Sequence, residues 1–124
     1  MTAMKLQKLV YYCQAWSLVW DEQPIFPEKI EAWANGPVVR ELYERHRGMF
    51  RVSKWDGNPD VLVPDEKNTV EIVLNFYCKY SSLELSNMTH REDPWRNARD
   101  GMHSSERGDK EITHAAMAEY YSNL

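Results

Sequence analysis

The tetrapeptide His90-Arg91-Glu92-Asp93 places an imidazole within three residues of two carboxylates, which are the residue types of general acid–base catalysis. A small hydrolase that uses His90 with Glu92 or Asp93 is therefore one function to weigh. The same residues are also typical of a polar helix end with a hydrogen-bonded histidine. The sequence has no nucleophile elbow and no Gly-rich phosphate loop, because its five glycines stand singly. We therefore favour the structural interpretation and expect no enzymatic activity.

Metal chemistry is equally weakly indicated. The four histidines form no pair at i, i+3 or i+4 and no HExxH motif; they are His46, His90, His103 and His114. The two cysteines, Cys13 and Cys78, are far apart and belong to apolar-periodic segments. We interpret them as buried free thiols in a reducing compartment. The sequence thus predicts no metal and no cofactor.

A basic stretch stands out in an acidic chain. Its members are Arg40, Arg45, Arg47, Arg51 and Lys54, set against only Glu41 and Glu44. This spacing is compatible with an ordinary solvated helix face, with a docking surface for an acidic partner, or with a nucleic-acid contact. All three remain open, and the acidic side chains Asp21, Glu22 and Glu28 offer an alternative surface for a basic partner.

The aromatic content is the second unusual feature, with five Trp and seven Tyr. Tyr11 and Tyr12 are adjacent in a helical pattern, about 100° apart, so both can hardly face the same core. Surplus aromatic side chains at a surface are common anchors of protein–protein interfaces. Tyr11, Tyr12 and Trp55 are therefore candidate partner-binding residues, although most of the aromatics also fit a core.

Apolar spacing and capping signals then indicate the elements that must position these residues. They predict helices over residues 4–20, from Pro37 to Gly48, 66–79, 82–90, from Pro94, and a last helix capped by Asp109. Thr2 and Ser81 are candidate N-caps. Ile112, Ala116 and Tyr120 are expected to face inward from the last helix.

The remaining segments are shorter. Residues 30–33 are ambiguous between strand and turn, and the polar residues 99–108 predict a mobile loop. Turn signals at Asp56-Gly57 and Asn58-Pro59 favour a small β-ribbon at about residues 49–64. The fold class we expect is mainly α: a compact, single-domain helical bundle spanning residues 1–124.

Length and charge exclude some classes. The chain has 124 residues and a net charge of −4, whereas proteins that coat nucleic acid usually carry a basic excess. The longest uncharged apolar-rich stretch, residues 9–20, is shorter than the ~20 residues that cross a bilayer. Because the N-terminus also shows no secretory signal, we expect a cytoplasmic protein with no membrane partner.

Four blocks of the sequence, taken in order, resemble the SocA-like antitoxin family, or Panacea domain. Residues 4–16, MKLQKLVYYCQAW, are similar to the family's KLQKLLYYAQAW opening. Residues 30–39, IEAWANGPVV, resemble its IEAWxxGPVV block and are followed by Leu42-Tyr43. Residues 85–95, LSNMTHREDPW, are similar to its LSxLTHxExPW block, and residues 112–121 to its closing helix.

This resemblance implies a bacterial antitoxin, often encoded by a phage or prophage, that neutralises a cognate protein toxin by direct binding. It also implies that a cellular protease receives the toxin in some systems, and it implies no activity of the domain as an enzyme. The motif residues are expected to determine the fold; they are Lys5, Gln7, Lys8, Trp16, Trp33, Gly36, Pro37, Tyr43, Thr89, His90, Pro94 and Trp95. A DNA-binding autoregulator is the rival class, disfavoured by the charge and by the lack of a separate helix-turn-helix segment.

The chain departs from many relatives in one respect, because they carry about one more helix before the KLQKL block. Either this chain is a short form or it begins at an internal methionine. If that helix is absent, we expect the first helix to expose Lys5, Lys8 and a second face to the toxin or to another copy of the chain; that face comprises Tyr12, Ala15 and Val19.

Overall fold

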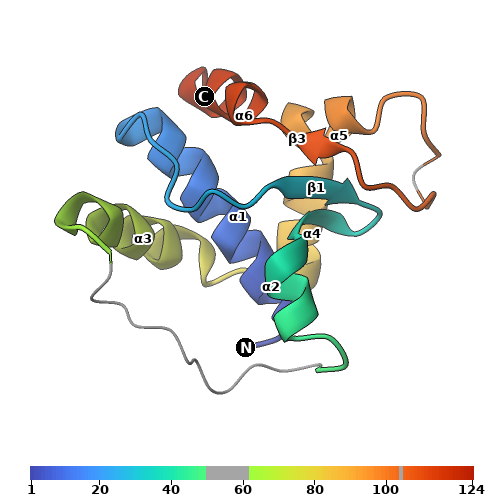
Figure 1. Cartoon of the computed structure of the whole chain (residues 1–124), viewed down its shortest axis with the longest axis horizontal. Coiled ribbons are helices and arrows are strands. Elements are labelled where there is room, and N and C mark those ends of the chain that lie inside the picture. The colour runs from blue at the N-terminus through green and yellow to red at the C-terminus, as the bar shows by residue number, and fades with distance from the viewer. Residues whose placement is uncertain (50–61, 104) are drawn as a thin grey trace.

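The computed structural model describes residues 1–49, 62–103 and 105–124, and within them the chain is mainly helical with one small antiparallel sheet (Figure 1). The elements are α1 (Ala3–Trp20), β1 (Ile30–Trp33), β2 (Gly36–Val39), α2 (Arg40–Arg45), α3 (Pro64–Tyr77), α4 (Ser82–His90), α5 (Asp93–Ala98), β3 (Glu111–Ile112) and α6 (His114–Ser122). The prediction of a mainly α fold with a small β component is confirmed. The ribbon expected at about residues 49–64 falls largely outside the described residues, and the described sheet lies elsewhere.

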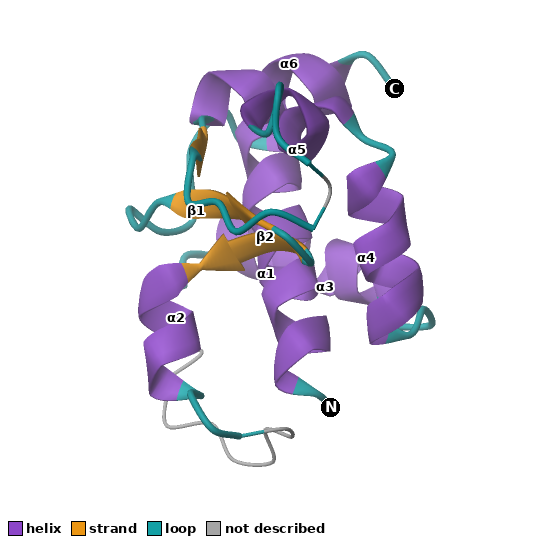
Figure 2. Cartoon of the chain, turned by 90° about the vertical axis from the view of Figure 1, so that its right-hand side faces the viewer, coloured by secondary structure: helices purple, strands orange, loops and turns teal. Residues whose placement is uncertain are grey.

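Helix α1 is the central element, and α3, α4, α6 and β2 all pack against it (Figures 1 and 2). Thr2 caps it as predicted, since its Oγ1 accepts a 3.0 Å hydrogen bond from the Lys5 amide. Because neighbours cover α1 on several sides, Tyr11 and Tyr12 are only 1% and 0% exposed. The expectation that both could not be buried is therefore wrong. The second face of α1 is not exposed either, since Ala15 is fully buried and Val19 packs against the core. The expectation that Lys8 is exposed is also wrong, because its side chain is 1% exposed.

The sheet has the strand order β2-β1-β3, with both pairs antiparallel. Trp33 pairs with Gly36 across a two-residue turn, and Ile30 pairs with both Val39 and Ile112. The residues before α2 are thus a strand, so the prediction of a helix from Pro37 is wrong. The hairpin partner decides this, because Pro37 is compatible with an extended strand as well as with a helix start.

The last helix also begins later than expected. Residues 111–112 pair with β1, and the Thr113 hydroxyl caps α6 by accepting a 3.1 Å hydrogen bond from the Ala116 amide. Asp109 is therefore not the cap. Met117 and Tyr121 are the buried residues of α6, whereas the predicted Ala116 and Tyr120 are half-buried.

The helices after the undescribed segment follow local signals. Helix α4 begins after Ser81 as predicted, with Ser81 and Glu84 exchanging two hydrogen bonds of 2.9 and 3.1 Å in a capping box. Helix α3 begins at Pro64 and ends at Tyr77, each two residues earlier than predicted. Cys78 lies just beyond it and is exposed, so only Cys13 matches the prediction of buried thiols.

No helix in the described part of the chain is long and apolar enough to cross a lipid bilayer.

Candidate functional site

A buried carboxylate joins α1 to the C-terminal half of the chain. Oε1 of Glu92 accepts hydrogen bonds of 2.7 Å from the Tyr12 hydroxyl and 2.8 Å from the Tyr121 hydroxyl. The Tyr11 and Tyr121 hydroxyls lie 3.0 Å apart, and the Tyr77 ring stacks on Tyr12 with centroids 4.0 Å apart. Burial raises the pKa of Glu92, partly opposed by the two hydroxyl donors. This cluster joins the helices α1, α3 and α6 to the turn between α4 and α5.

The tyrosines of this cluster are poor proton donors to solvent. Burial raises the pKa of Tyr77 to about 12 and that of Tyr11, Tyr12 and Tyr121 further still. Tyr11 and Tyr12 are 1% and 0% exposed, so neither ring is accessible to a partner in this structure.

His90 is held by stacking and is not joined to a carboxylate. Its ring lies parallel to Trp95, with centroids 4.0 Å apart, and its buried Nε2 has no hydrogen-bond partner among the described residues. Burial lowers the pKa of His90, and the positive charges of Lys8 and Arg99 lower it further. Because Glu92 instead binds tyrosines and Asp93 is exposed, the structure does not bring together the acid–base pair of the hydrolase hypothesis.

Two glutamines on α1, seven residues apart, hold the chain that follows. The Gln7 side chain accepts a 2.9 Å hydrogen bond from the Val39 amide and donates one of 3.3 Å to the Val39 carbonyl. Gln14 likewise accepts from the Ile25 amide at 2.8 Å and donates to the Phe26 carbonyl at 2.9 Å. Both side chains are buried, and they supply hydrogen-bond partners to the backbone at the end of β2 and in the segment between α1 and β1.

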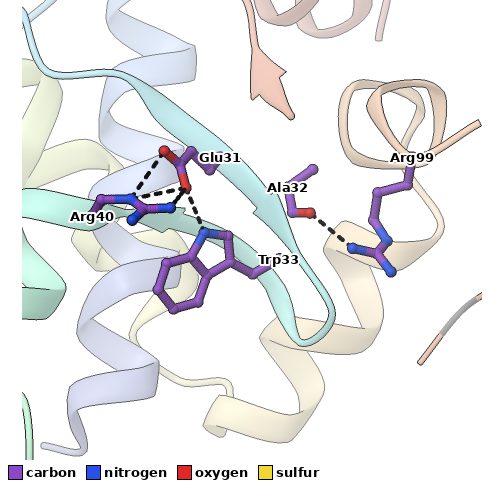
Figure 3. A network of polar contacts seen from close by, with 5 residues as sticks. All are labelled: Glu31, Ala32, Trp33, Arg40 and Arg99. Carbon is purple, nitrogen blue, oxygen red and sulfur yellow. Dashed lines mark hydrogen bonds and ion pairs between the residues drawn. The ribbon is translucent and has the colours of Figure 1, made fainter. Parts of the chain in front are cut away.

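The β1–β2 hairpin is held from both sides (Figure 3). On one side Glu31 binds the Arg40 guanidinium at 3.0 Å and accepts a 2.8 Å hydrogen bond from the Trp33 indole. On the other side Arg99, only 4% exposed, donates a 2.9 Å hydrogen bond to the Ala32 carbonyl and others to the carbonyls of His103 and Glu106. The segment expected to be a polar mobile loop therefore begins with a buried arginine.

The remaining motif residues also make contacts within the chain. The Lys5 amino group donates to the Cys78 carbonyl at 2.6 Å, and the Trp16 indole to the Tyr77 hydroxyl at 3.0 Å. The Thr89 hydroxyl donates to the Ser86 carbonyl at 2.7 Å. The Trp95 indole donates to the Trp33 carbonyl at 2.8 Å, and Pro37 and Pro94 are buried.

One open pocket, of about 840 Å³, lies where α1, the hairpin, α2 and the segment before β3 meet. Its lining includes the buried Lys8, whose pKa burial lowers to about 8, and the exposed Arg40, Arg47 and Arg107. Tyr43, 38% exposed, stands at the same wall with its ring 4.9 Å from Trp33. Arg45 is exposed on α2, while Arg51, Lys54 and Trp55 lie outside the described residues.

The predicted residues thus divide into two groups. Most motif side chains are buried within the chain, whereas the described members of the basic stretch are exposed on α2 or just after it, with Arg40 and Arg47 in the pocket lining. Sequence reasoning missed Gln14 and Arg99, because nothing local distinguishes them from solvated polar residues. No three His, Cys, Asp or Glu side chains lie together as a metal ion would require, within the residues that the structure describes.

Comparison with known families finds one match. A family model described as "Antitoxin SocA-like, Panacea domain" matches residues 6–96, well over half of the chain. Comparisons with curated proteins and with solved structures found no match.

Proposed function

The chain belongs to the SocA-like antitoxin family, the Panacea domain, and from this premise we propose that it neutralises a cognate protein toxin by binding it directly. The observation that carries the proposal is the family match over residues 6–96, the part of the chain that runs from α1 into α5. As an antitoxin, the chain acts in the bacterial cytoplasm, where the toxin is made.

The proposed mechanism is occlusion, in which one face of the antitoxin covers the toxin's active or substrate-binding surface. The pocket and its basic rim support this choice of face, because exposed arginines are strong anchors in interfaces. Arg45 is exposed, and among the described residues Arg47 makes one exposed ion pair, with Glu44 at 3.7 Å, which is worth little in water. Both side chains are therefore available to an acidic partner.

The test is a co-expression rescue. The reading frame next to this gene is induced in bacteria with and without the chain, and complexes are recovered by affinity pull-down. We expect growth arrest that the chain relieves, together with a stable complex of the two proteins. Arrest that the chain cannot relieve contradicts the proposal, and an operator-DNA shift by the chain alone would favour the autoregulator instead.

A charge-reversal pair tests the face. Arg47→Glu, a change of an exposed arginine in the pocket lining, is expected to weaken the rescue, whereas Lys29→Glu, a change of an exposed lysine outside the lining, is expected to keep it. Repeating the rescue in strains that lack individual cytoplasmic proteases separates occlusion from delivery. Occlusion predicts relief in every such strain, while delivery predicts that one deletion abolishes it.

A further inference from the structure

Lys8 is an anomaly among the buried residues of α1. Its side chain is 1% exposed, and in the part of the chain that the structure describes its amino group has no hydrogen-bond or ion-pair partner. The other buried polar side chains of α1, Gln7, Gln14 and Ser17, all make hydrogen bonds. The ammonium group is therefore largely desolvated and keeps only slight contact with solvent at the pocket, and partial desolvation without a partner costs free energy.

The backbone makes room for this side chain. Gly36 has φ +124°, and a Cβ added there would lie 2.6 Å from Cε of Lys8 and 3.1 Å from the Thr89 hydroxyl oxygen. The end of the Lys8 stem therefore crosses the hairpin at the one residue without a side chain. Because Lys8 also belongs to the pocket lining, its charge lies at the inner wall of a space open to solvent.

The surroundings of the pocket select an anion. Besides Lys8, three arginines line it, against the two carboxylates of Glu44 and Asp109. Arg40, Arg47 and Arg107 are all exposed, and Arg40 and Arg47 also pair with Glu31 and Glu44, so Lys8 is the one buried cation among the described lining residues. A buried, uncompensated charge attracts an opposite charge more strongly than an exposed one, since water screens it less.

We propose that the pocket receives an acidic side chain of the toxin, whose carboxylate pairs with the ammonium group of Lys8. This inference rests on the proposed function and names the chemistry of the partner. A carboxylate is favoured over a phosphate because the one buried ammonium balances one negative charge, whereas the lining arginines are exposed and their charges are screened by water. Met4, Trp33 and Val38 also line the pocket and provide apolar contact for the stem of the incoming residue.

The pairing predicts opposite effects on the free protein and on the complex. Lys8→Met keeps the length of the stem and removes the charge. It is expected to raise the Tm of the isolated chain by about 4 °C or more, because the uncompensated ammonium is gone. It is expected to weaken the toxin complex by about 30-fold or more, because the toxin carboxylate loses its partner. A lysine with a purely structural role would lower stability when replaced.

The first experiment uses the isolated chain. Thermal unfolding compares the wild type, Lys8→Met and the exposed-lysine control Lys29→Met, and NMR follows the Lys8 ε-carbon during titration with sodium acetate, sodium phosphate or sodium chloride. We expect a higher Tm for Lys8→Met alone and a saturable shift with acetate that chloride at equal ionic strength does not produce. A lower Tm for Lys8→Met, a shift with phosphate but not with acetate, or no shift with either anion overturns the proposal.

The second experiment uses the complex with the neighbouring-frame toxin, once wild-type rescue has been shown. Each Asp and Glu of the toxin is replaced by its amide, alone and together with Lys8→Met. One toxin substitution should weaken the complex as much as Lys8→Met does. Combined with Lys8→Met, that substitution should cause no further loss of affinity. If Lys8→Met binds as tightly as the wild type, this inference fails and the antitoxin function stands. Failure of the wild type itself to rescue contradicts the proposed function, and the isolated-chain experiment still decides the pocket.

Discussion

The hydroxyl of Tyr12 donates a 2.7 Å hydrogen bond to Oε1 of Glu92, a residue 80 positions further along the chain. The bond joins the middle of the central helix to the turn between α4 and α5. Tyr121, in the last helix, donates to the same oxygen at 2.8 Å. A single carboxylate therefore organises contacts among segments that are distant in sequence, at the cost of being largely withdrawn from water.

The stability of the chain should carry a pH dependence that originates from Glu92. Burial raises the pKa of Glu92 above the ordinary 4.5, so the folded state binds the carboxyl proton more tightly than the unfolded chain does. The stability that this proton contributes to the folded state is lost as pH rises through the folded pKa. Between pH 4.5 and neutrality the wild type should therefore lose stability relative to Glu92→Gln. Urea unfolding across this range measures it, with the exposed Glu119→Gln as control. Parallel profiles for Glu92→Gln and the wild type would contradict the assignment.

Gly36→Ala should be among the most destabilising single-methyl additions. The new Cβ would lie 2.6 Å from Cε of Lys8, and the alanine would have to adopt φ +124°, which side-chain-bearing residues rarely do. We expect a loss of about 2 kcal/mol or more in the free energy of unfolding. Gly48→Ala is the matched control, because Gly48 has φ +83° but no described atom lies within 4 Å of an added Cβ. Its backbone strain alone costs about 1 kcal/mol. Equal losses measured by chemical denaturation would argue against the steric contact.

Gln7→Ala should release β2 from α1. The Val39 amide loses its side-chain acceptor, and a buried unsatisfied group costs about 1–3 kcal/mol. Hydrogen exchange checks the location of the effect: the Val39 amide should exchange faster in Gln7→Ala, and the Ile25 amide in Gln14→Ala. Gln23→Ala, a change of an exposed glutamine, should alter neither. Unchanged protection of the Val39 amide in Gln7→Ala would show that this amide is not hydrogen-bonded to Gln7.

Arg99→Lys should loosen the segment between α5 and β3. The guanidinium reaches the carbonyls of Ala32, His103 and Glu106 at once, which the single ammonium of lysine cannot reproduce. Limited proteolysis should therefore cut residues 100–110 faster in this variant. Arg96→Lys, a change of an exposed arginine in α5, is the control and should be cut at the wild-type rate. Identical rates for all three proteins would contradict a structural role for Arg99.

The two thiols should differ in reactivity. Cys78 is exposed, whereas Cys13 is 8% exposed and burial raises its pKa to about 12. An aromatic disulfide reagent should therefore modify one thiol rapidly in the native protein and two after denaturation. The variant Cys78→Ser should lose the rapid phase. Rapid reaction of that variant would show that Cys13 is accessible.

Local signals in the sequence were enough for several helices. Helix α4 follows from Ser81 and Glu84, whose capping box satisfies its own first amides, and α1 follows from Thr2 and its apolar spacing. These interactions join residues three or four apart, so no distant partner is needed to form them. The order of the motif blocks likewise identified the family.

Long-range partners decided the rest. Residues 36–39 and 111–112 are strands because both pair with β1, and that pairing overrides the helix signals at Pro37 and Asp109. Both Tyr11 and Tyr12 face inward because Glu92 and Tyr121 satisfy their hydroxyls from remote parts of the chain. The unpartnered charge of Lys8 is also invisible in the sequence. Composition and local spacing thus determined the helices and the family, whereas burial and pairing across many residues, which only the folded chain defines, determined the sheet, the core and the pocket.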